Sequence, residues 1–362
     1  MKTFNTDVLI IGGGPAGASA AVSILKYSKL SVAIVEVSNL ETVRVGEQVS
    51  KSIFDFLNHL GLEKSDFGDD CFLPGYSSNA AWGNSKISSR HSIQSTEVDS
   101  YQLNRDIFDL VMLSKAQEKG ASLFLETKCI SFNKNADNWE VEINNSDLGT
   151  ITIVSKYLID ASGRQSHVSR QLGAKISKAD GLVAVGAFLE FNTDKPLEHE
   201  IFLETVEDGW WYYALLPNNK ILATLFTDAE IIKEKRLNSI ENWSNALQNT
   251  VHMKHKVSGT VSHEKLWVRN AFSHITDFSM ITDFIAIGDA AASFDPISSM
   301  GIGFAISSAC NGALAIIDGG TERIATYQSD LYNIYNHYLE TRAQYYHQEV
   351  RWLNSAFWNG KN

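Results

Sequence analysis

The first forty residues contain two short apolar runs, with a glycine-rich turn and a helical pattern between them. Residues 7–11 (DVLII) form a β-branched apolar run that is too short for a helix, which predicts a buried parallel strand. Glycines follow, and residues 15–27 then carry small and apolar residues at helical spacing. Residues 31–35 predict a second buried strand that ends at Glu36. Together these segments predict a βαβ unit.

Further segments and the tail are predicted to be helical. The predicted helices cover residues 50–60, 105–119, 228–249 and a long stretch after Gly301. Residues 322–354 predict one or two more helices, with one stripe at spacings of three and four formed by Tyr327, Leu331, Tyr335, Tyr338, Arg342 and Tyr345. We expect this stripe to pack on the main body; the alternative is a docking face for a partner protein.

Strand patterns dominate the middle of the chain. Runs at 122–132, 139–144 and 151–159 are separated by turns rich in Asn, Asp and Gly, which predicts an antiparallel meander. Residues 182–226 are again strand-rich, and their last part predicts a hairpin of 210–216 with 221–226 across Pro217-Asn218-Asn219-Lys220. Return strands are expected near 258–268 and at 284–287.

This order of elements predicts an α/β fold with two domains and a helical C-terminus. A length of 362 residues fits about two structural lobes. We expect a discontinuous nucleotide-binding domain from residues 1–70, 100–180 and 270–320. Residues 71–99 and 181–269 would form a β-rich substrate domain, and 321–362 a C-terminal helical segment.

Composition narrows the class of protein. The chain is 44% hydrophobic and 20% charged, which excludes an intrinsically disordered protein. Its net charge is −11 and it has no Lys/Arg-rich run, so nucleic acid is not an expected partner. Cys71, Cys129 and Cys310 lie far apart and fit a reducing compartment, which predicts a cytoplasmic protein.

Two uncharged stretches could suggest a signal peptide or a membrane span, and one histidine pair could suggest a metal site, but we expect none of these. Residues 8–25 are interrupted by Gly12-Gly13-Gly14-Pro15, which disfavours a signal peptide. Residues 296–317 contain serines and Asn311, so no membrane span is expected there. His252 and His255 form H-x-x-H without a third ligand at metal spacing; we expect a solvated helix face and no metal.

The glycine-rich turn carries the strongest chemical signal. GGGPAG (12–17) is a G-x-G-x-x-G pattern between the predicted strand and helix. Gly12 permits the tight turn, Gly14 lets the backbone approach a pyrophosphate, and Gly17 lets the helix pack on the strand. The helix N-terminus offers N–H groups to the phosphates. Glu36, at the end of the second strand, is placed to accept hydrogen bonds from a ribose, so the pattern predicts a dinucleotide site.

Six segments in order resemble the superfamily of single-component flavoprotein hydroxylases and flavin-dependent halogenases. They are GGGPAG, Glu36, RVGEQVS (44–50), NRDIFD (104–109), IDASGRQSHVSRQLGA (159–174) and GDAAASFDPISSMGIG (288–303). The resemblance implies a Rossmann-like FAD-binding domain of the aromatic-hydroxylase type. It also implies FAD as the cofactor and dioxygen as a reactant. The segment 160–164 resembles one linked to pyridine nucleotides, so NAD(P)H or a separate reductase is the implied electron source.

The resemblance also implies which residues hold the cofactor. These are Gly12, Gly14, Pro15, Ala16, Gly17, Glu36, Arg44, Arg105, Cys129, Asp160, Gly163, Asp289, Pro296, Gly301, Ile302 and Gly303. Arg44 and Arg105 would reach the phosphate or ribitol, and Asp289 would accept a ribitol hydroxyl. Cys129 would offer only its backbone to the adenine. The Pro296–Gly303 loop and the following helix N-terminus would lie beside the flavin ring.

Three residues are candidates for catalysis, each with a structural alternative. Glu47 is expected on the ring side of the Arg44 segment, where the alternative is an ion pair with a neighbouring cation. Asp295 precedes Pro296 and is equally suited to cap a turn. Trp211 lies in the aromatic run 210–213, whose side chains alternate faces, so at most one pair faces a pocket; the alternative is core packing.

The chemistry of the flavin separates three hypotheses. Halogenases resemble one another in W-x-W-x-I-P and in a lysine between flavin and substrate; this chain has GWWYYALLP (209–217), and we expect Lys86 on the surface. GWWYYALLPNNK, AAWGNSKISSR and FDPISSMGI instead resemble the GoxB/LodB-type flavoproteins, which help to build cysteine tryptophylquinone in oxidase precursors. That resemblance implies hydroxylation of a tryptophan in a partner precursor. The alternatives are a hydroxylase or halogenase of a free small aromatic molecule, and a non-catalytic adaptor.

Overall fold

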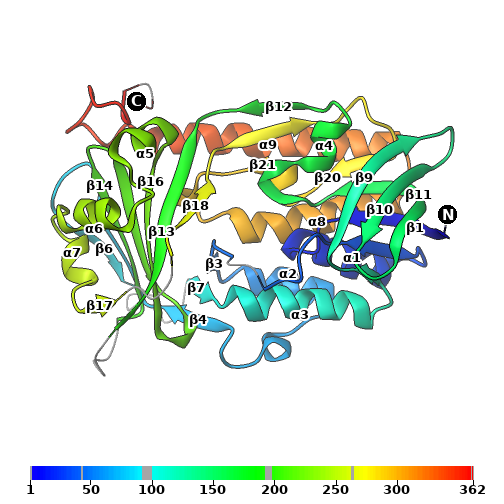
Figure 1. Ribbon diagram of the computed structural model, residues 1–362, viewed down its shortest axis with the longest axis horizontal. Helices are drawn as coiled ribbons and strands as arrows, with labels where there is room; N and C mark the ends of the chain where they lie inside the picture. Colours follow the sequence, from blue (N-terminus) through cyan, green and yellow to red (C-terminus); the bar gives the residue numbers. More distant parts are fainter. Residues whose placement is uncertain are drawn as a thin grey trace.

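The computed structural model describes residues 2–41, 44–91, 100–191, 198–261, 265–359 and 361. Two main sheets lie at opposite ends of an elongated molecule, and long helices run along its length (Figure 1). None of the helices in these ranges is long and apolar enough to cross a membrane.

The first sheet has seven strands in the order β8-β2-β1-β11-β10-β9, with β20 also paired to β11. Its strands are β1 (Lys2–Ile11), β2 (Val32–Val35), β8 (Ser122–Phe124), β9 (Thr127–Lys134), β10 (Trp139–Asn145), β11 (Gly149–Asp160) and β20 (Phe284–Ala286). Strand β11 runs parallel to β1 along its length, while its other edge pairs antiparallel with β10 and then parallel with β20. The carboxyl ends of β1, β11 and β20 therefore meet at one edge of the sheet.

The predicted meander is partly wrong. Residues 122–132 form two strands, because the chain turns at Glu126, whose φ is +49°. Strand β8 pairs parallel with β2, and only β9, β10 and β11 form antiparallel pairs.

Helices cover the first sheet, and the predicted helix 15–27 is confirmed. They are α1 (Pro15–Tyr27), α2 (Ile53–Leu60), α3 (Arg105–Glu118), α4 (His167–Gln171) and α8 (Gly301–Ile317). Helix α1 packs against α3 and α8. Its buried residues are mostly Ala, Gly and Ser, which let neighbouring backbones approach closely.

The second sheet has eight strands in the order β17-β13-β16-β15-β14-β5-β6, with β18 paired to β13. The strands are β5 (Ser77–Ala81), β6 (Ser88–His91), β13 (Leu182–Phe191), β14 (Glu200–Val206), β15 (Gly209–Leu215), β16 (Lys220–Asp228), β17 (Thr260–Val261) and β18 (Trp267–Asn270). The predicted hairpin is the β15–β16 pair. The predicted helix 228–249 is two helices, α5 (Ala229–Lys235) and α6 (Ile240–Gln248), interrupted at Arg236 with φ +52°. Helix α7 (Met253–Lys256) follows.

Two small sheets and the C-terminal helix complete the fold. The small sheets contain β3 (Gln48–Ser50), β4 (Phe72–Gly75) and β7 (Ser100–Leu103), and β12 (Lys175–Lys178), β19 (His274–Asp277) and β21 (Ala292–Ser293). Helix α9 (Thr321–Tyr346) runs along the long axis of the molecule, from the region of the first sheet toward the second (Figure 1).

The packing prediction for the tail stripe is confirmed, with one exception. The first four residues of the stripe are buried in the hydrophobic core around the first sheet. Tyr345 is 43% exposed, and the adjacent Tyr346 is buried instead, in the hydrophobic core around the second sheet. One helix therefore contributes to both cores.

Candidate flavin site

The glycine-rich turn between β1 and α1 has the close approaches that its glycines permit. Gly12 has φ +117°, and a Cβ there would lie 2.2 Å from the carbonyl oxygen of Ala161. A Cβ on Gly17 would lie 1.8 Å from the carbonyl oxygen of Gly12. At Gly14 a Cβ would meet nothing within 4 Å. The N-terminus of α1 has neither a side-chain cap nor an acidic residue in its first turn, so it can receive an anion.

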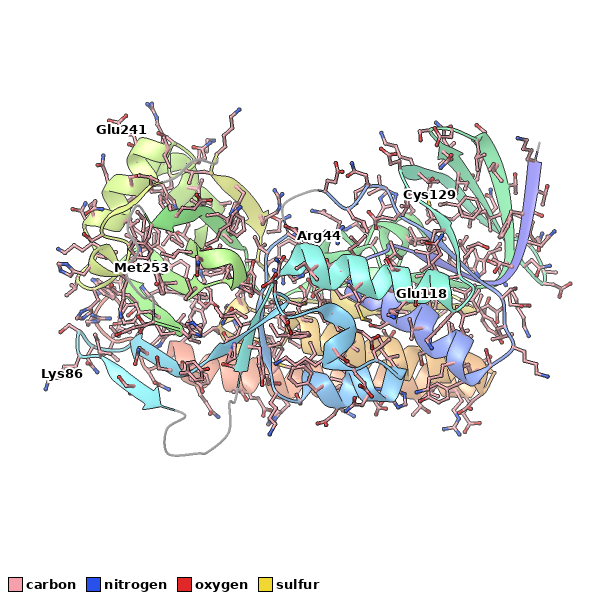
Figure 2. The ribbon with its side chains drawn as sticks, turned by 90° about the horizontal axis from the view of Figure 1, so that it is seen from below. Arg44, Lys86, Glu118, Cys129, Glu241 and Met253 are labelled. Atoms are coloured by element: carbon pink, nitrogen blue, oxygen red, sulfur yellow. The ribbon has the colours of Figure 1, made fainter. Side chains whose placement is uncertain are left out.

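Glu36 lies at the carboxyl end of β2, beside this turn. Its Oε2 accepts a hydrogen bond from the Gly13 N–H at 2.7 Å, and its backbone oxygen accepts one from Thr127 of β9. Cys129 is two residues farther along β9, at the opposite end of the molecule from Lys86 (Figure 2). Burial, reinforced by Asp160, raises the pKa of the Cys129 thiol to about 12, so the thiol is neutral at physiological pH.

A cavity of about 390 Å³ lies between the first sheet's carboxyl edge and the second sheet. Its first wall, called here the flavin wall, contains predicted site residues: Gly14, Pro15, Ala16, Glu47, Arg105, Gly163, Asp289, Asp295, Pro296, Gly301 and Ile302. Its second wall, the substrate wall, comes from β13, β15, β16 and β18: Ala184, Tyr212, Leu222, Thr224, Phe226, Trp267, Arg269 and Asn270. The structure thus brings nine of the implied FAD contacts to one cavity.

Polar atoms without partners support a polar ligand in this cavity. Glu47 Oε1, Thr224 Oγ1 and Trp267 Nε1 are buried, and each lacks a hydrogen-bond partner. All three residues line the cavity. Since buried polar atoms are nearly always hydrogen-bonded, the donor and acceptor set fits a heteroaromatic ring system such as that of FAD. When bound, FAD would supply the redox chemistry, and the open turn at Gly14 would receive its pyrophosphate.

Arg44 and Arg105 share one buried carboxylate. Asp109 Oδ2 lies 2.6 Å from Arg44 Nη1 and 2.8 Å from Arg105 Nη2. Arg105 Nη1 also donates to the carbonyl oxygens of Val45 and Gly46. Arg105 therefore fixes the loop that carries Glu47, and Arg44 lies outside the flavin cavity, in a smaller neighbouring one.

Asp160 holds the turn that follows β11. Its Oδ1 accepts from the Ser162 backbone and hydroxyl, and its Oδ2 from the Ser169 backbone and hydroxyl. These four bonds position the Gly163 turn at the flavin wall. Arg164 Nη2 lies 3.4 Å from Asp289 Oδ2 in the same cavity. Gly303 lines a separate cavity on the other side of the Pro296 loop.

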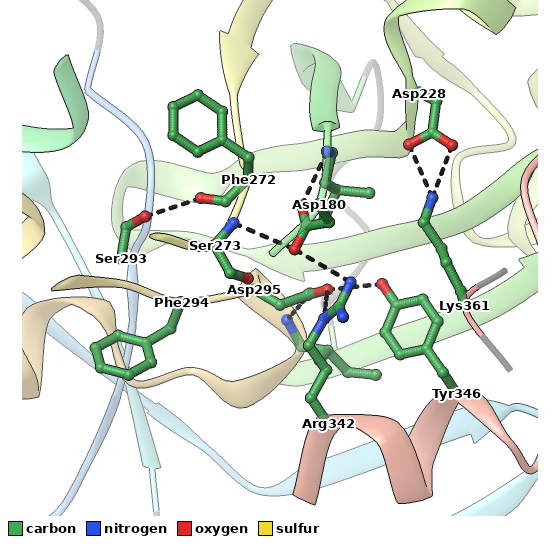
Figure 3. Close-up of polar contacts among 12 residues, drawn as sticks. Asp180, Asp228, Phe272, Ser273, Ser293, Phe294, Asp295, Arg342, Tyr346 and Lys361 are labelled. Carbon is green, nitrogen blue, oxygen red and sulfur yellow. Dashed lines mark hydrogen bonds and ion pairs between the residues drawn. The ribbon is translucent and has the colours of Figure 1, made fainter. Parts of the chain in front are cut away.

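Asp295 ties the flavin wall to the C-terminal helix (Figure 3). Its Oδ1 accepts from the Ile297 N–H at 3.0 Å, which caps the turn after it. Its Oδ2 accepts from Arg342 Nε at 3.1 Å and from the Tyr346 hydroxyl at 2.7 Å. Arg342 Nη2 also lies 3.2 Å from Asp180. Asp295 thus has the capping contacts of its structural alternative, together with an ion pair to α9.

Glu47 differs from these carboxylates because its Oε1 has no partner. It is only 4% exposed. Burial raises the pKa of the Glu47 carboxyl to about 7, and the positive charge of Arg105 opposes that rise. Burial also raises the pKa of Tyr212, with the charge of Glu47 as a second cause, so the phenol stays protonated.

Trp211 and Lys86 lie away from the flavin cavity. Trp211 packs edge-on against Trp243 of α6 and lines a cavity of about 530 Å³ on the opposite face of the second sheet. Tyr212, the next residue, faces the flavin cavity, as the alternation of strand side chains requires. Lys86 is exposed in the turn between β5 and β6, as predicted, and Figure 2 shows it at the tip of the molecule.

The H-x-x-H pair, His252 and His255, has a spacing that could suggest a metal site. In the ranges that the structure covers, no group of three or more His, Cys, Asp or Glu side chains is arranged to hold a metal ion. His252 Nε2 instead contacts the Ser85 carbonyl oxygen at 2.8 Å, and His255 is exposed.

The sequence did not identify most of the substrate wall. Its residues lie on four strands and approach one another only through strand register, as in the pairs Tyr212–Thr224 of β15–β16 and Gly186–Trp267 of β13–β18. The predicted hairpin contained one usable signal, because pairing Trp210 with Phe226 puts Tyr212 opposite Thr224.

The comparisons with known proteins agree with this site. Residues 5–338 match the FAD binding domain family, FAD_binding_3. The chain is 40% identical to the FAD-dependent oxidoreductase LodB of Marinomonas mediterranea, over 98% of this chain and 96% of that protein. It is 25% identical to the flavin-dependent halogenase armH4 of Armillaria mellea, covering 86% of this chain and 65% of that one.

Solved structures show the same fold. The flavin-dependent halogenase CmlS has a TM-score of 0.87 at 24% identity, covering 99% of this chain and 68% of that one. The myxobacterial chondrochloren halogenase CndH has a TM-score of 0.88 at 18% identity, covering 99% and 86%. The predicted Rossmann-like fold and the LodB-type resemblance are thereby confirmed. The chain belongs to the FAD binding domain family and is an FAD-dependent oxidoreductase.

Proposed function

We propose that this flavoprotein is a monooxygenase that hydroxylates a tryptophan side chain in a partner oxidase precursor, as one step in forming cysteine tryptophylquinone. The observation that carries the proposal is the 40% identity to LodB over nearly the full length of both chains. The resemblance of this chain to the LodB-type branch of flavoproteins is what implies a tryptophan in a partner protein as the substrate. FAD-dependent oxidoreductase chemistry is common to the wider family, so only the protein-borne tryptophan is specific to the proposal.

The two walls of the cavity support an aromatic substrate next to FAD. Tyr212, Phe226 and Trp267 on the substrate wall offer flat apolar surfaces against which an indole ring can pack. Arginine is the only basic residue type among the described residues that line the cavity. This agrees with the missing W-x-W-x-I-P motif and disfavours halogenation of the kind that uses a pocket lysine.

The proposed reaction balances with one external reductant. One oxygen atom of dioxygen is inserted into an indole C–H bond to give C–O–H, and the other leaves as water. NAD(P)H, or a reductase that uses it, supplies two electrons, and one proton is taken up. The residues of this chain bind and orient the reactants and exclude water from the cavity.

Co-expression of the oxidase precursor with variants of this protein tests the proposal. Wild type should add oxygen to one tryptophan of the precursor, detected by peptide mass spectrometry and by the visible absorbance of the quinone. Gly14→Asp, which places a negative charge where the pyrophosphate would bind, should abolish both signals. Gly181→Asp is the matched control, because a Cβ there also meets nothing within 4 Å and the residue lies outside the cavity. A precursor that is modified equally without this protein would contradict the proposal.

A free small aromatic molecule is the second candidate substrate. The aromatic side chains Tyr212, Phe226 and Trp267 on the substrate wall could pack against a free aromatic ring as well as against a protein-borne indole. Turnover of free indoles with NAD(P)H and dioxygen, in the absence of any protein partner, would favour this candidate over a protein substrate.

A further inference from the structure

Two cavities meet at the loop that carries Glu47. The flavin cavity lies on one side. On the other side is a smaller cavity of about 130 Å³, called here the outer cavity, which Glu41, Arg44, Asp106 and Lys220 help to line. Among the residues that the structure describes, two with titratable side chains line both cavities, Glu47 and Arg105. These two residues separate a charged cavity from the flavin site.

Arg105 is unsuited to carrying protons across this boundary. Its guanidinium donates to Asp109 and to the carbonyl oxygens of Val45 and Gly46. An arginine in a protein also stays protonated. Glu47 is the opposite case, because its Oε1 is buried without a partner and its carboxyl can gain or lose a proton.

We propose that Glu47 transfers protons from the outer cavity to the flavin cavity. Reduction of bound FAD to FADH2 would take up protons, and the carboxyl of Glu47 borders both the flavin cavity and the outer cavity, from which water can supply them. Glu47 donates a proton on the flavin side, becomes a carboxylate, and regains a proton from water in the outer cavity. No bond other than O–H bonds forms or breaks at Glu47.

The charges around Glu47 suit this role. Arg105 of α3 faces the carboxyl and stabilises the carboxylate form, while burial favours the protonated form. Tyr212 of β15 faces it from the substrate wall and stays neutral. The balance of these effects places the pKa of Glu47 at about 7, so both forms are populated at physiological pH. This inference depends on flavin redox chemistry and not on which molecule is hydroxylated, so it can fail or succeed independently of the proposed substrate.

Infrared titration of the FAD-free protein tests the first part of the proposal. Wild type should show a protonated carboxyl band that disappears with a midpoint near pH 7 and is absent from Glu47→Gln. Glu41→Gln is the control, because Glu41 lines only the outer cavity and is exposed. It should keep the band. Absence of any carboxyl that titrates near neutral pH in the wild type would overturn the proposal.

Proton uptake during reduction tests the second part. The FAD-loaded proteins are reduced in a stopped-flow instrument with reduced methyl viologen, an electron donor whose oxidation releases no protons, and a pH-indicator dye reports proton uptake. An artificial donor makes the result independent of the natural electron donor. Glu47→Gln should slow uptake by about 10- to 100-fold, Glu47→Asp should slow it less, and Glu41→Gln should leave it unchanged. Uptake by Glu47→Gln at the wild-type rate would overturn the proposal.

Discussion

The two walls of the flavin cavity are built in different ways. Most of the flavin wall comes from segments that follow the parallel strands β1, β11 and β20, and its anchoring carboxylates are bonded to neighbouring parts of the chain, as Asp160 is to Ser162 and Ser169. The substrate wall consists of side chains on antiparallel strands, with aromatic residues and the unpartnered atoms Thr224 Oγ1 and Trp267 Nε1.

This difference separates binding of the cofactor from selection of the substrate. Backbone conformation and small residues shape the flavin wall, so a cofactor common to a large family can be held there by a few motifs. Large side chains shape the substrate wall, so single substitutions there can change specificity while the sheet persists. The following predictions test how far the two walls act independently.

The largest effect is expected at Gly14 on the flavin wall. Gly14→Asp brings a carboxylate toward the FAD pyrophosphate, and like charges at such a distance cost several kcal/mol. We expect FAD affinity to fall by about 100-fold or more, measured by fluorescence titration. The fold should persist, because Gly14 has an ordinary φ of −71° and open space around its Cβ position. Gly181→Asp should bind FAD normally; equal loss in both variants would refute a specific pyrophosphate contact.

A smaller effect is expected from Glu47, at the boundary of the flavin wall. The pKa of its carboxyl is raised from 4.5 to about 7 in the folded protein, so folding favours the protonated form. Stability should therefore fall as the pH rises from about 4.5 to about 7, and should not fall further above that range because of this group. At pH 8, Glu47→Gln should be more stable than wild type by on the order of 3 kcal/mol, and at pH 4 nearly equal to it.

Urea unfolding of the FAD-free proteins at both pH values measures this difference. Glu41→Gln serves as the control for removal of an acid, since Glu41 is exposed. A gain in stability for Glu47→Gln that is the same at pH 4 and pH 8 would show that packing, and not burial of the charge, causes it.

The same contrast explains what could be predicted from the sequence. The β1–α1 turn and the Pro296 loop could be predicted as parts of the candidate site because their patterns lie in contiguous residues, and residues of both line the cavity. Tyr212 and Trp267 reach the cavity through pairings between strands that are far apart in the chain, which local patterns do not specify. The role of Asp109 was missed because a buried acid on a helix gives no local signal of the two arginines that it binds.

Gly186 of β13, which packs against Trp267 and Thr224 of the substrate wall, provides a test with a moderate effect. A Cβ at Gly186 would lie 2.3 Å from Trp267 Cζ2 and 2.8 Å from Thr224 Oγ1, so Gly186→Ala must displace the indole. Overpacking of this kind costs about 1–3 kcal/mol of stability. If the walls act independently, FAD affinity should stay within about twofold of wild type while substrate turnover falls. Gly181→Ala, in open space, controls for the added methyl group. A parallel loss of FAD affinity would show that the two walls are coupled.

The smallest effect is expected at Lys86, which lies on neither wall. Its side chain is exposed in the turn between β5 and β6, next to Ser85, which lines the cavity on the outer face of the second sheet. A halogenase-type mechanism requires a lysine between flavin and substrate, and Lys86→Ala would then abolish turnover. Because Lys86 contacts neither wall, we expect Lys86→Ala to retain wild-type FAD affinity and turnover, with stability changed by less than about 0.5 kcal/mol. Loss of turnover with FAD still bound would contradict the position of Lys86 described here and favour the halogenase alternative.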